Sequence, residues 1–156
     1  MQLTSQITEH FRSVHTGNNW TAVNLKDTLS DVTLQEAMTP VGSLNTIARL
    51  VFHINYYVSA VLQVLRGAPL NASDKLSFDH PPLATETEWR QLVAKTLEDA
   101  DAFAALIEKF PESRLGEVFE NPDYGNYYRN FHGIVEHTHY HLGQIAVIKK
   151  LLREKA

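Results

Sequence analysis

Apolar residues recur at spacings of three and four in four stretches of the chain, which is the pattern of a helix with one buried face. These stretches cover about residues 3–16, 43–66, 89–110 and 127–152. The second has the longest apolar stripe, which consists of Leu44, Ile47, Val51, Ile54, Val58, Val61 and Leu65. No stretch alternates apolar and polar residues as a half-buried strand does. The pattern therefore predicts an all-α protein.

Residues that favour helix ends set the expected boundaries. Gly17 is expected to end the first helix, and Ser43 is placed to cap the start of the second. Gly67 and Pro69 are expected to end the second helix. Pro111 is expected to end the third, because proline has no backbone N–H to donate.

Two segments between the long helices have different patterns. Residues 20–40 contain three spaced leucines and two residues that favour helix caps, Asp31 and Thr33. This segment is expected to form one or two short helices across an end of the bundle. Residues 68–85 contain several prolines and show no helical period, so they are expected to form a surface connection.

A chain of 156 residues, of which 44% are hydrophobic, is long enough to bury one core. We therefore expect a single domain over residues 1–156. Its predicted architecture is an antiparallel four-helix bundle with one or two short extra helices between the first and second long helices.

The charge and the residue types exclude several classes of protein. The chain has 18 acidic and 14 basic side chains, a net charge of −4, and no long basic block, so attraction to nucleic acid or anionic lipid is not expected. The lack of cysteine excludes disulfides, thiolate ligands and a cysteine nucleophile. Arg49 and His53 interrupt the most hydrophobic stretch, and the first residues lack the apolar core of a signal peptide. We expect a cytoplasmic protein with no nucleic-acid or membrane partner.

Three histidines stand at alternate positions in VEHTHYHLGQ, within the fourth predicted helix. Because each helical residue advances by about 100°, His137 and His141 share a face and His139 points nearly the opposite way. A pair four residues apart can bind one metal ion, although such pairs also occur by chance or on solvated faces. His141 lies on an apolar stripe, where an imidazole without a partner costs about 1–3 kcal/mol. His141 therefore needs a partner, and a metal is one candidate.

His53 presents the same question on the flank of the second predicted helix, one turn before Tyr57. It could hydrogen-bond a backbone carbonyl or Tyr57, or it could join His137 and His141 around a metal. Three neutral imidazoles suit zinc, nickel, iron or copper, and they leave a coordination position open for water or substrate.

Other motifs in the chain support no metal or catalytic site. His132 and His139 share a mixed polar face with Glu136, which is typical of a helix side near solvent, and neither is expected to be a ligand. Glu136 and His139 have the spacing of half a ferritin-type di-iron motif, but a second motif is missing. The sequences typical of zinc proteases, serine hydrolases and phosphate-binding glycine loops are also missing.

Three segments resemble a known family. They are IARLVFHINYYVSAVLQVLRG, FHGIVEHTHYHLGQIAVIKK and the earlier NNWTAVNLKDTLSDVTLQEAMTP. They resemble the DinB-like superfamily, which includes bacillithiol-transferase and YfiT-type proteins, and the similarity spans nearly the whole chain. Its most specific part is the ending formed by His137, His141, Gly143, Gln144 and Ile145. The resemblance implies a four-helix bundle in which His53, His137 and His141 bind a divalent metal.

The resemblance also implies an activity, transfer of a low-molecular-weight thiol that the metal activates as a thiolate. The first hypothesis is a metal-dependent thiol S-transferase that takes a small-molecule thiol and an electrophilic substrate. Zinc is the first choice of metal, with nickel, iron or manganese as alternatives. The other hypotheses are a non-catalytic metal-binding or stress-response module and a metal-dependent hydrolase.

Further residues have expected roles around this site and on the surface. Tyr57 and Gln144, each near a ligand by helical phase, are the candidates to orient a bound group. Trp20 is expected to cap the core rather than to line a pocket. Val64 and Leu151 could support a homodimer, as bundles of this family often pair, or could complete the core of the monomer.

Overall fold

The computed structural model describes residues 2–154, and its elements are helices joined by loops. The elements are α1 (Leu3–Thr16), α2 (Leu25–Leu29), α3 (Leu34–Met38), α4 (Ile47–Leu65), α5 (Glu86–Glu108), the 3-10 helices η1 (Glu112–Arg114) and η2 (Pro122–Tyr124), and α6 (Tyr127–Glu154). Residues 2–154 contain no β-strand, and an isolated bridge joins Val118 to Asn126. The predicted all-α class is confirmed.

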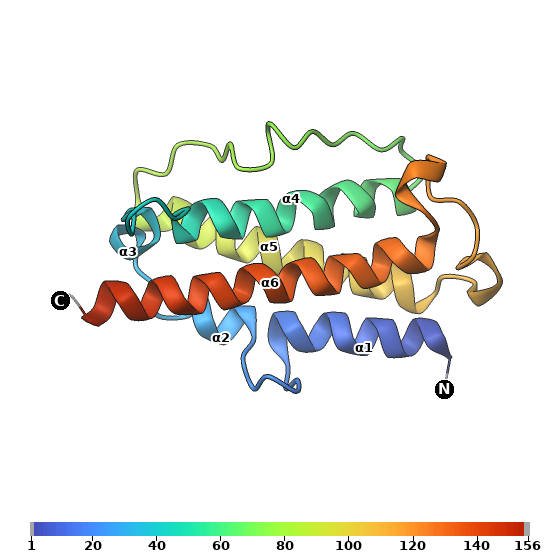
Figure 1. Ribbon diagram of the computed structural model, residues 1–156, viewed down its shortest axis with the longest axis horizontal. Coiled ribbons are helices and arrows are strands. Elements are labelled where there is room, and N and C mark those ends of the chain that lie inside the picture. Colours follow the sequence, from blue (N-terminus) through green and yellow to red (C-terminus); the bar gives the residue numbers. More distant parts are fainter. Residues whose placement is uncertain (1, 155–156) are drawn as a thin grey trace.

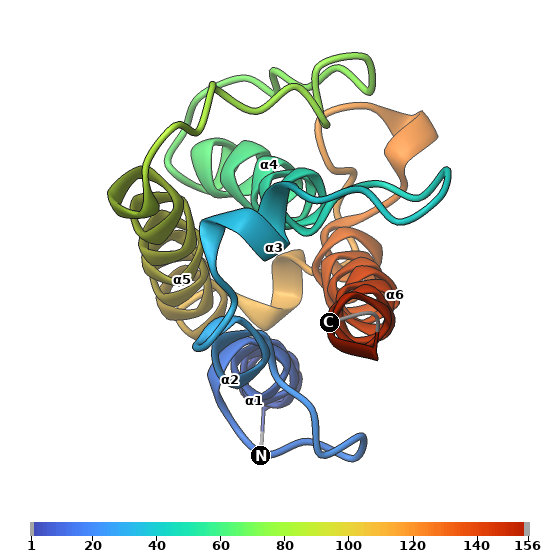
Figure 2. The same cartoon turned by 90° about the vertical axis from the view of Figure 1, so that its left-hand side faces the viewer.

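The four long helices lie side by side, with α1 and α6 running in one direction and α4 and α5 in the other (Figure 1). An end-on view shows them at the corners of a square (Figure 2). Helix α1 contacts α5 and α6, and α4 contacts the same two helices. The antiparallel pairs are therefore α1 with α5 and α4 with α6. The neighbours α4 and α5 are parallel because residues 66–85 return along the length of the bundle (Figure 1).

Helix α4 begins later than the sequence pattern predicts. Its N-cap is Thr46, whose hydroxyl accepts a hydrogen bond from the Arg49 backbone N–H. The predicted cap, Ser43, lies in a preceding turn, in which the Leu44 N–H donates to the Val41 carbonyl. Leu44 is consequently half exposed and does not belong to the apolar stripe. Both Ser43 and Thr46 suit an N-cap, so residue type alone did not distinguish them.

Helices α2 and α3 are the two short helices expected after α1. Their N-caps are Asn24 and Thr33. Asp31, which was expected to cap, instead forms ion pairs with Lys149 and Arg153 of α6. These pairs hold the α2–α3 connection against the end of α6.

Trp20 does not cap the core, so this prediction is wrong. Its side chain is fully exposed, in a turn where Asn19 donates to the carbonyls of Ser13 and Val23. The tryptophan that fills the core is Trp89, which is fully buried and donates its indole N–H to the Val32 carbonyl.

The core has two parts along the bundle axis. One lies around α1, the second half of α4, α5 and the start of α6, and it includes Phe11, Phe103 and Phe131. The other lies under α2 and α3 and includes Trp89 and Ile145. Val64 is 7% exposed and belongs to the first part, so it completes the monomer core and is not available to a second chain.

Helix α4 is long and apolar enough to cross a membrane by length and composition. However, 56% of that window is buried inside the bundle, and α4 contacts both α5 and α6. Its apolar stripe is therefore explained by its place as a core helix.

Candidate metal centre

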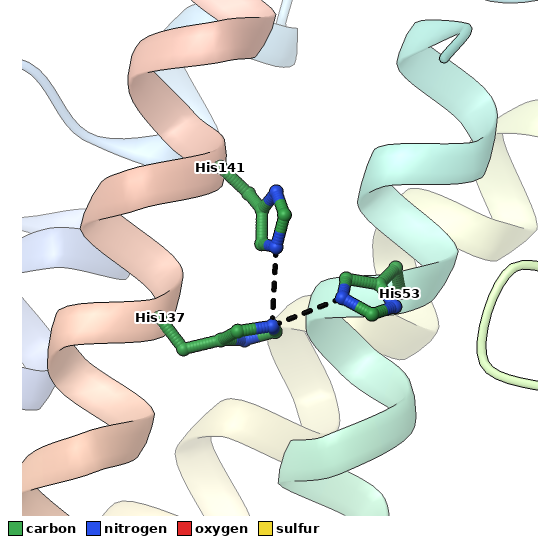
Figure 3. A group of neighbouring side chains, drawn as sticks. All are labelled: His53, His137 and His141. Atoms are coloured by element: carbon green, nitrogen blue, oxygen red, sulfur yellow. Dashed lines mark hydrogen bonds between the residues drawn. The ribbon is translucent and has the colours of Figure 1, made fainter. Parts of the chain in front are cut away.

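The three histidines singled out from the sequence meet between α4 and α6 (Figure 3). The Nε2 atom of His137 lies 3.0 Å from Nε2 of His53 and 3.1 Å from Nε2 of His141. One nitrogen from each ring can be chosen so that all three lie within 4.8 Å of one another. His53 and His141 are each 7% exposed, and His137 is half-buried. The arrangement is a compact group of imidazoles that could bind one metal ion.

The helices explain why these three side chains converge. His137 and His141 are one turn apart on α6, so their rings lie on the same side of that helix, edge-on to each other with centroids 4.5 Å apart. His53 projects from the antiparallel helix α4 into the same space, and its ring centroid is 4.8 Å and 4.7 Å from those of His137 and His141.

A loop residue determines which nitrogen of His53 carries the proton. Its Nδ1 lies 3.0 Å from the hydroxyl oxygen of Ser77 and 3.3 Å from the Ser77 carbonyl oxygen. The Ser77 hydroxyl already donates its proton to the Asp74 carbonyl. Both Ser77 oxygens are therefore acceptors toward His53, so Nδ1 carries the proton and Nε2 presents a lone pair.

Gln144 fixes His141 in the same way. The side-chain oxygen Oε1 of Gln144 lies 2.7 Å from Nδ1 of His141, and an amide oxygen can only accept. Nε2 of His141 therefore also presents a lone pair toward His137. Sequence reasoning placed Gln144 near a ligand, and the structure adds that it holds the ring of that ligand.

This proton arrangement leaves an excess of lone pairs in the centre of the group. His137 can donate one proton from Nε2, and that proton can satisfy only one of the two facing nitrogens. The remaining lone pair faces a second nitrogen in a half-buried space. A cation at this position would satisfy all three nitrogens, so the residues present fit a divalent metal.

Burial favours the neutral form that a metal ligand requires. Removal from water lowers the pKa of His53 to about 4, with a further contribution from His141. Burial, together with the neighbouring His141 and His53, likewise lowers the pKa of His137 to about 4. Burial also lowers the pKa of His141, against the opposing hydrogen bond to Gln144. The three rings are therefore neutral at neutral pH and free to bind a cation.

Two aromatic rings cover the group. Phe78 stacks on His53 with ring centroids 3.8 Å apart and planes 6° from parallel. Tyr57 lies edge-on to both His53 and His137, at centroid distances of 5.2 and 5.1 Å. Its hydroxyl donates to the Asp74 carboxylate over 2.5 Å, and burial and this hydrogen bond raise its pKa. These rings limit the access of water to the histidines.

A cavity of about 410 Å³ opens beside the group. His53, Tyr57 and His137 form one end of it, and residues at the start of α6 form the other. A larger cavity of about 680 Å³ lies between α4, α5 and the loop that follows α4, but none of the three histidines lines it. The smaller cavity is therefore the one through which a small molecule could reach the centre.

Two other histidines of α6 lie away from the centre, as expected. His132 is exposed and pairs with Glu136. His139 faces α1, where burial and His10 lower its pKa. Neither is part of the converging group.

The residues that sequence reasoning missed come from one loop. Asp74, Ser77 and Phe78 lie in the segment that was expected to be only a surface connection. This segment does run over the surface, but it also contacts His53 and Tyr57. No periodicity or motif marks these three residues, because their role depends on how the loop crosses α4.

The chain is similar to a known family of proteins. A family model described as the DinB superfamily matches residues 19–145, which is most of the chain. The matched range contains all three histidines and the loop that covers them. No curated protein and no solved structure matches the chain.

Proposed function

The chain belongs to the DinB superfamily, and from this premise we propose that it binds a divalent metal through His53, His137 and His141 and is a metal-dependent thiol S-transferase. The observation that carries the metal site is the excess of lone pairs between the three Nε2 atoms. The observation that supports chemistry is the cavity, which reaches His53 and His137 from one side.

Three neutral nitrogen ligands favour zinc, with nickel or iron as alternatives, whereas manganese prefers oxygen ligands. Such an ion supplies an open coordination position at which a thiol loses its proton near neutral pH. In the proposed reaction the thiol sulfur forms a bond to an electrophilic carbon, and the bond from that carbon to the leaving group breaks with its electron pair. The thiol proton passes to solvent.

The residues around the centre would keep the reacting groups in place. Gln144 and Ser77 hold the rings of His141 and His53 through their Nδ1 atoms. Tyr57 lines the cavity, and its hydroxyl proton is engaged by Asp74, so this side chain would help to position a bound group rather than donate a proton to it. Phe78 and Tyr57 exclude water, which would otherwise compete with the thiol.

Metal analysis of purified variants tests the ligand set. We expect one divalent metal per chain, retained in the His139→Ala variant and lost in His53→Ala, His137→Ala or His141→Ala. His139 is the matched control, because it lies on the same helix but outside the group. Full metal occupancy in His53→Ala would contradict the proposed site.

A conjugation assay tests the reaction. Zinc-loaded protein is incubated with 1-chloro-2,4-dinitrobenzene and, in turn, with bacillithiol, mycothiol, glutathione and coenzyme A. We expect one thiol to be conjugated faster than in the uncatalysed reaction, and we expect the rate increase to disappear in the His53→Ala variant. Stoichiometric metal with no conjugation of any thiol, but with hydrolysis of an ester, would favour the hydrolase. Metal with neither activity would favour the non-catalytic module.

A further inference from the structure

The cavity beside the metal centre extends along α6 to an arginine. His53 and His137 line one end of the cavity, and Arg129 and Asn130 line the other. Arg129 and His137 are eight residues apart on α6, so their Cα atoms are separated by about 12 Å along the helix axis. The side chain of Arg129 runs back toward Gly125, on the side away from His137, so the two groups lie at opposite ends of the cavity.

A glycine opens the space between these two ends. Gly133 stands midway between Arg129 and His137 and also lines the cavity. A Cβ added there would meet no other atom within 4 Å, so no neighbour requires a glycine at this position. Glycine inside a helix costs about 1 kcal/mol relative to alanine. Its effect here is to leave the space beside α6 open.

A second glycine makes room for the arginine itself. Gly125 has φ +76°, and a Cβ on it would lie 2.8 Å from Cδ of Arg129. Any other residue at this turn would displace the arginine side chain, which runs over the turn beside the cavity.

Among the residues that the structure describes, the guanidinium of Arg129 forms no ion pair. Asp123 also lines the cavity without pairing to it. One positive and one negative group suit a ligand with a single carboxylate better than a dianionic phosphate. The planar guanidinium can bind such a carboxylate through two hydrogen bonds.

We propose that Arg129 binds a carboxylate of the thiol substrate while the sulfur lies at the histidine group. The proposal rests on the proposed function, and it defines the substrate class as an extended thiol with a carboxylate about 10 Å or more from its sulfur. A short thiol acid would not span the cavity.

Simple thiols of two lengths test this. The probes are 8-mercaptooctanoate with its neutral counterpart 8-mercaptooctanol, and 3-mercaptopropionate with 3-mercaptopropanol. Zinc stoichiometry is measured first, and the dissociation constant of each probe for zinc-loaded protein is then measured by calorimetry. We expect the long acid to bind about fivefold more tightly than the long alcohol, and the two short probes to bind equally.

Two arginine variants test the residue. Arg129→Gln should abolish the preference for the long acid and leave zinc binding unchanged. The control is Arg66→Gln, which removes an exposed arginine at the end of α4 and should keep the preference. Arg129→Glu should reverse it, because the carboxylate of the probe would then be repelled.

The outcomes separate this inference from the proposed function. Zinc bound at one per chain, with equal affinity for the long acid and the long alcohol, would show that Arg129 is a solvated surface arginine and would overturn this inference alone. The same preference in Arg129→Gln as in the wild type would also overturn it. Failure of the wild type to bind zinc would overturn the proposed function, and this inference with it.

Discussion

Each imidazole of the centre has two nitrogens, and its neighbours decide which one faces the shared space. On the far side of each ring, one residue accepts the Nδ1 proton: Ser77 for His53 and Gln144 for His141. These groups fix the tautomer and the ring angle, so they should matter nearly as much to a metal as the ligands themselves.

Replacing Gln144 tests the role of these acceptors. The Gln144→Leu variant removes the oxygen that accepts from His141 Nδ1, so we expect zinc affinity to fall about 10- to 100-fold without complete loss. Competition with a chromogenic chelator measures the affinity. Gln91→Leu, an exposed change on α5, is the control and should bind zinc as the wild type does. Unchanged affinity in Gln144→Leu would mean that the ring of His141 is held by packing alone.

A histidine outside the centre makes stability depend on pH. His15 is 1% exposed, its Nε2 has no hydrogen-bond partner, and burial lowers its pKa to about 4. Since the unfolded chain has the ordinary value of 6.5, it binds more protons than the folded protein between pH 4 and 6.5. Above pH 6.5 the ring is neutral in both states, so His15 does not lower the free energy of unfolding. As the pH drops toward 4, protonation of His15 in the unfolded chain lowers the free energy of unfolding by on the order of 3 kcal/mol.

Urea unfolding of metal-free protein between pH 4 and 7 measures this effect. We expect the fall in unfolding free energy toward acid to be smaller in His15→Leu than in the wild type, because the leucine cannot take up a proton. His132→Leu changes an exposed histidine and serves as the control, with a slope close to that of the wild type. Equal slopes in the wild type and His15→Leu would contradict the prediction.

At the scale of elements, α6 contains residues that reduce its own helix propensity. Two glycines, Gly133 and Gly143, interrupt its interior, and a Cβ at either would meet no other atom within 4 Å. Only Gly133 lines the cavity beside the centre. Alanine at either position would therefore add the same helix propensity, but only at Gly133 would its methyl group take up space in the cavity.

Alanine substitutions at Gly133 and Gly143 separate the effect on stability from the effect on ligand binding. We expect Gly133→Ala and Gly143→Ala each to raise the free energy of unfolding by about 0.5–1 kcal/mol, measured by urea denaturation. Gly133→Ala should in addition weaken binding of 8-mercaptooctanoate to the zinc-loaded protein, whereas Gly143→Ala should not. Equal ligand affinity in both variants would show that the space at Gly133 is not used.

The loop of residues 66–85 affects both the packing of α4 with α5 and the surroundings of His53. It returns along α4 and thereby makes α4 and α5 parallel neighbours (Figure 1). On the way it places Ser77 and Phe78 against His53, and Asp74 against Tyr57. The connection thus sets both the topology of the bundle and the surroundings of one metal ligand.

At the scale of the whole molecule, the core does not depend on the metal. Both parts of the core are built from apolar side chains of several helices, and the histidine group lies beside them. We therefore expect chelation to leave the far-ultraviolet circular dichroism unchanged and to lower the melting temperature, because metal bound to the folded state alone adds to its stability. Turnover is measured on the same chelated sample. Helicity lost together with activity would point to a structural metal and contradict the catalytic proposal.

Val64, one of two residues considered for a homodimer, is part of the core, and Leu151 is half-buried on α6. The homodimer and the cytoplasmic location remain predictions from the sequence.

Local features of the chain could be predicted because they depend on residues close together in sequence. The helical spacings predicted four long helices, and Thr33 correctly marked the start of a short one. His137 and His141 could be paired from their spacing, because one turn of a helix fixes their relative positions before any other element packs. His53 was raised as a third ligand from its place on the flank of the second helix, with a simple hydrogen bond as the alternative, and the family resemblance then favoured the metal.

The tertiary structure decided what lies between distant segments. The polar side chain of Asp31 could have capped a helix, but two cations of α6 compete for it and form the ion pairs. Trp20 and Trp89 are both large and apolar, and only the packing of α5 under α2 and α3 determined which of them is buried. Ser77 became a partner of His53 only when the loop crossed α4, whereas Gln144 lies three residues after His141 on α6 and could be placed beside it from helical phase. The physical reason is that a hydrogen bond or a packed contact between distant residues depends on the relative position of whole elements, and one segment's sequence does not contain that position.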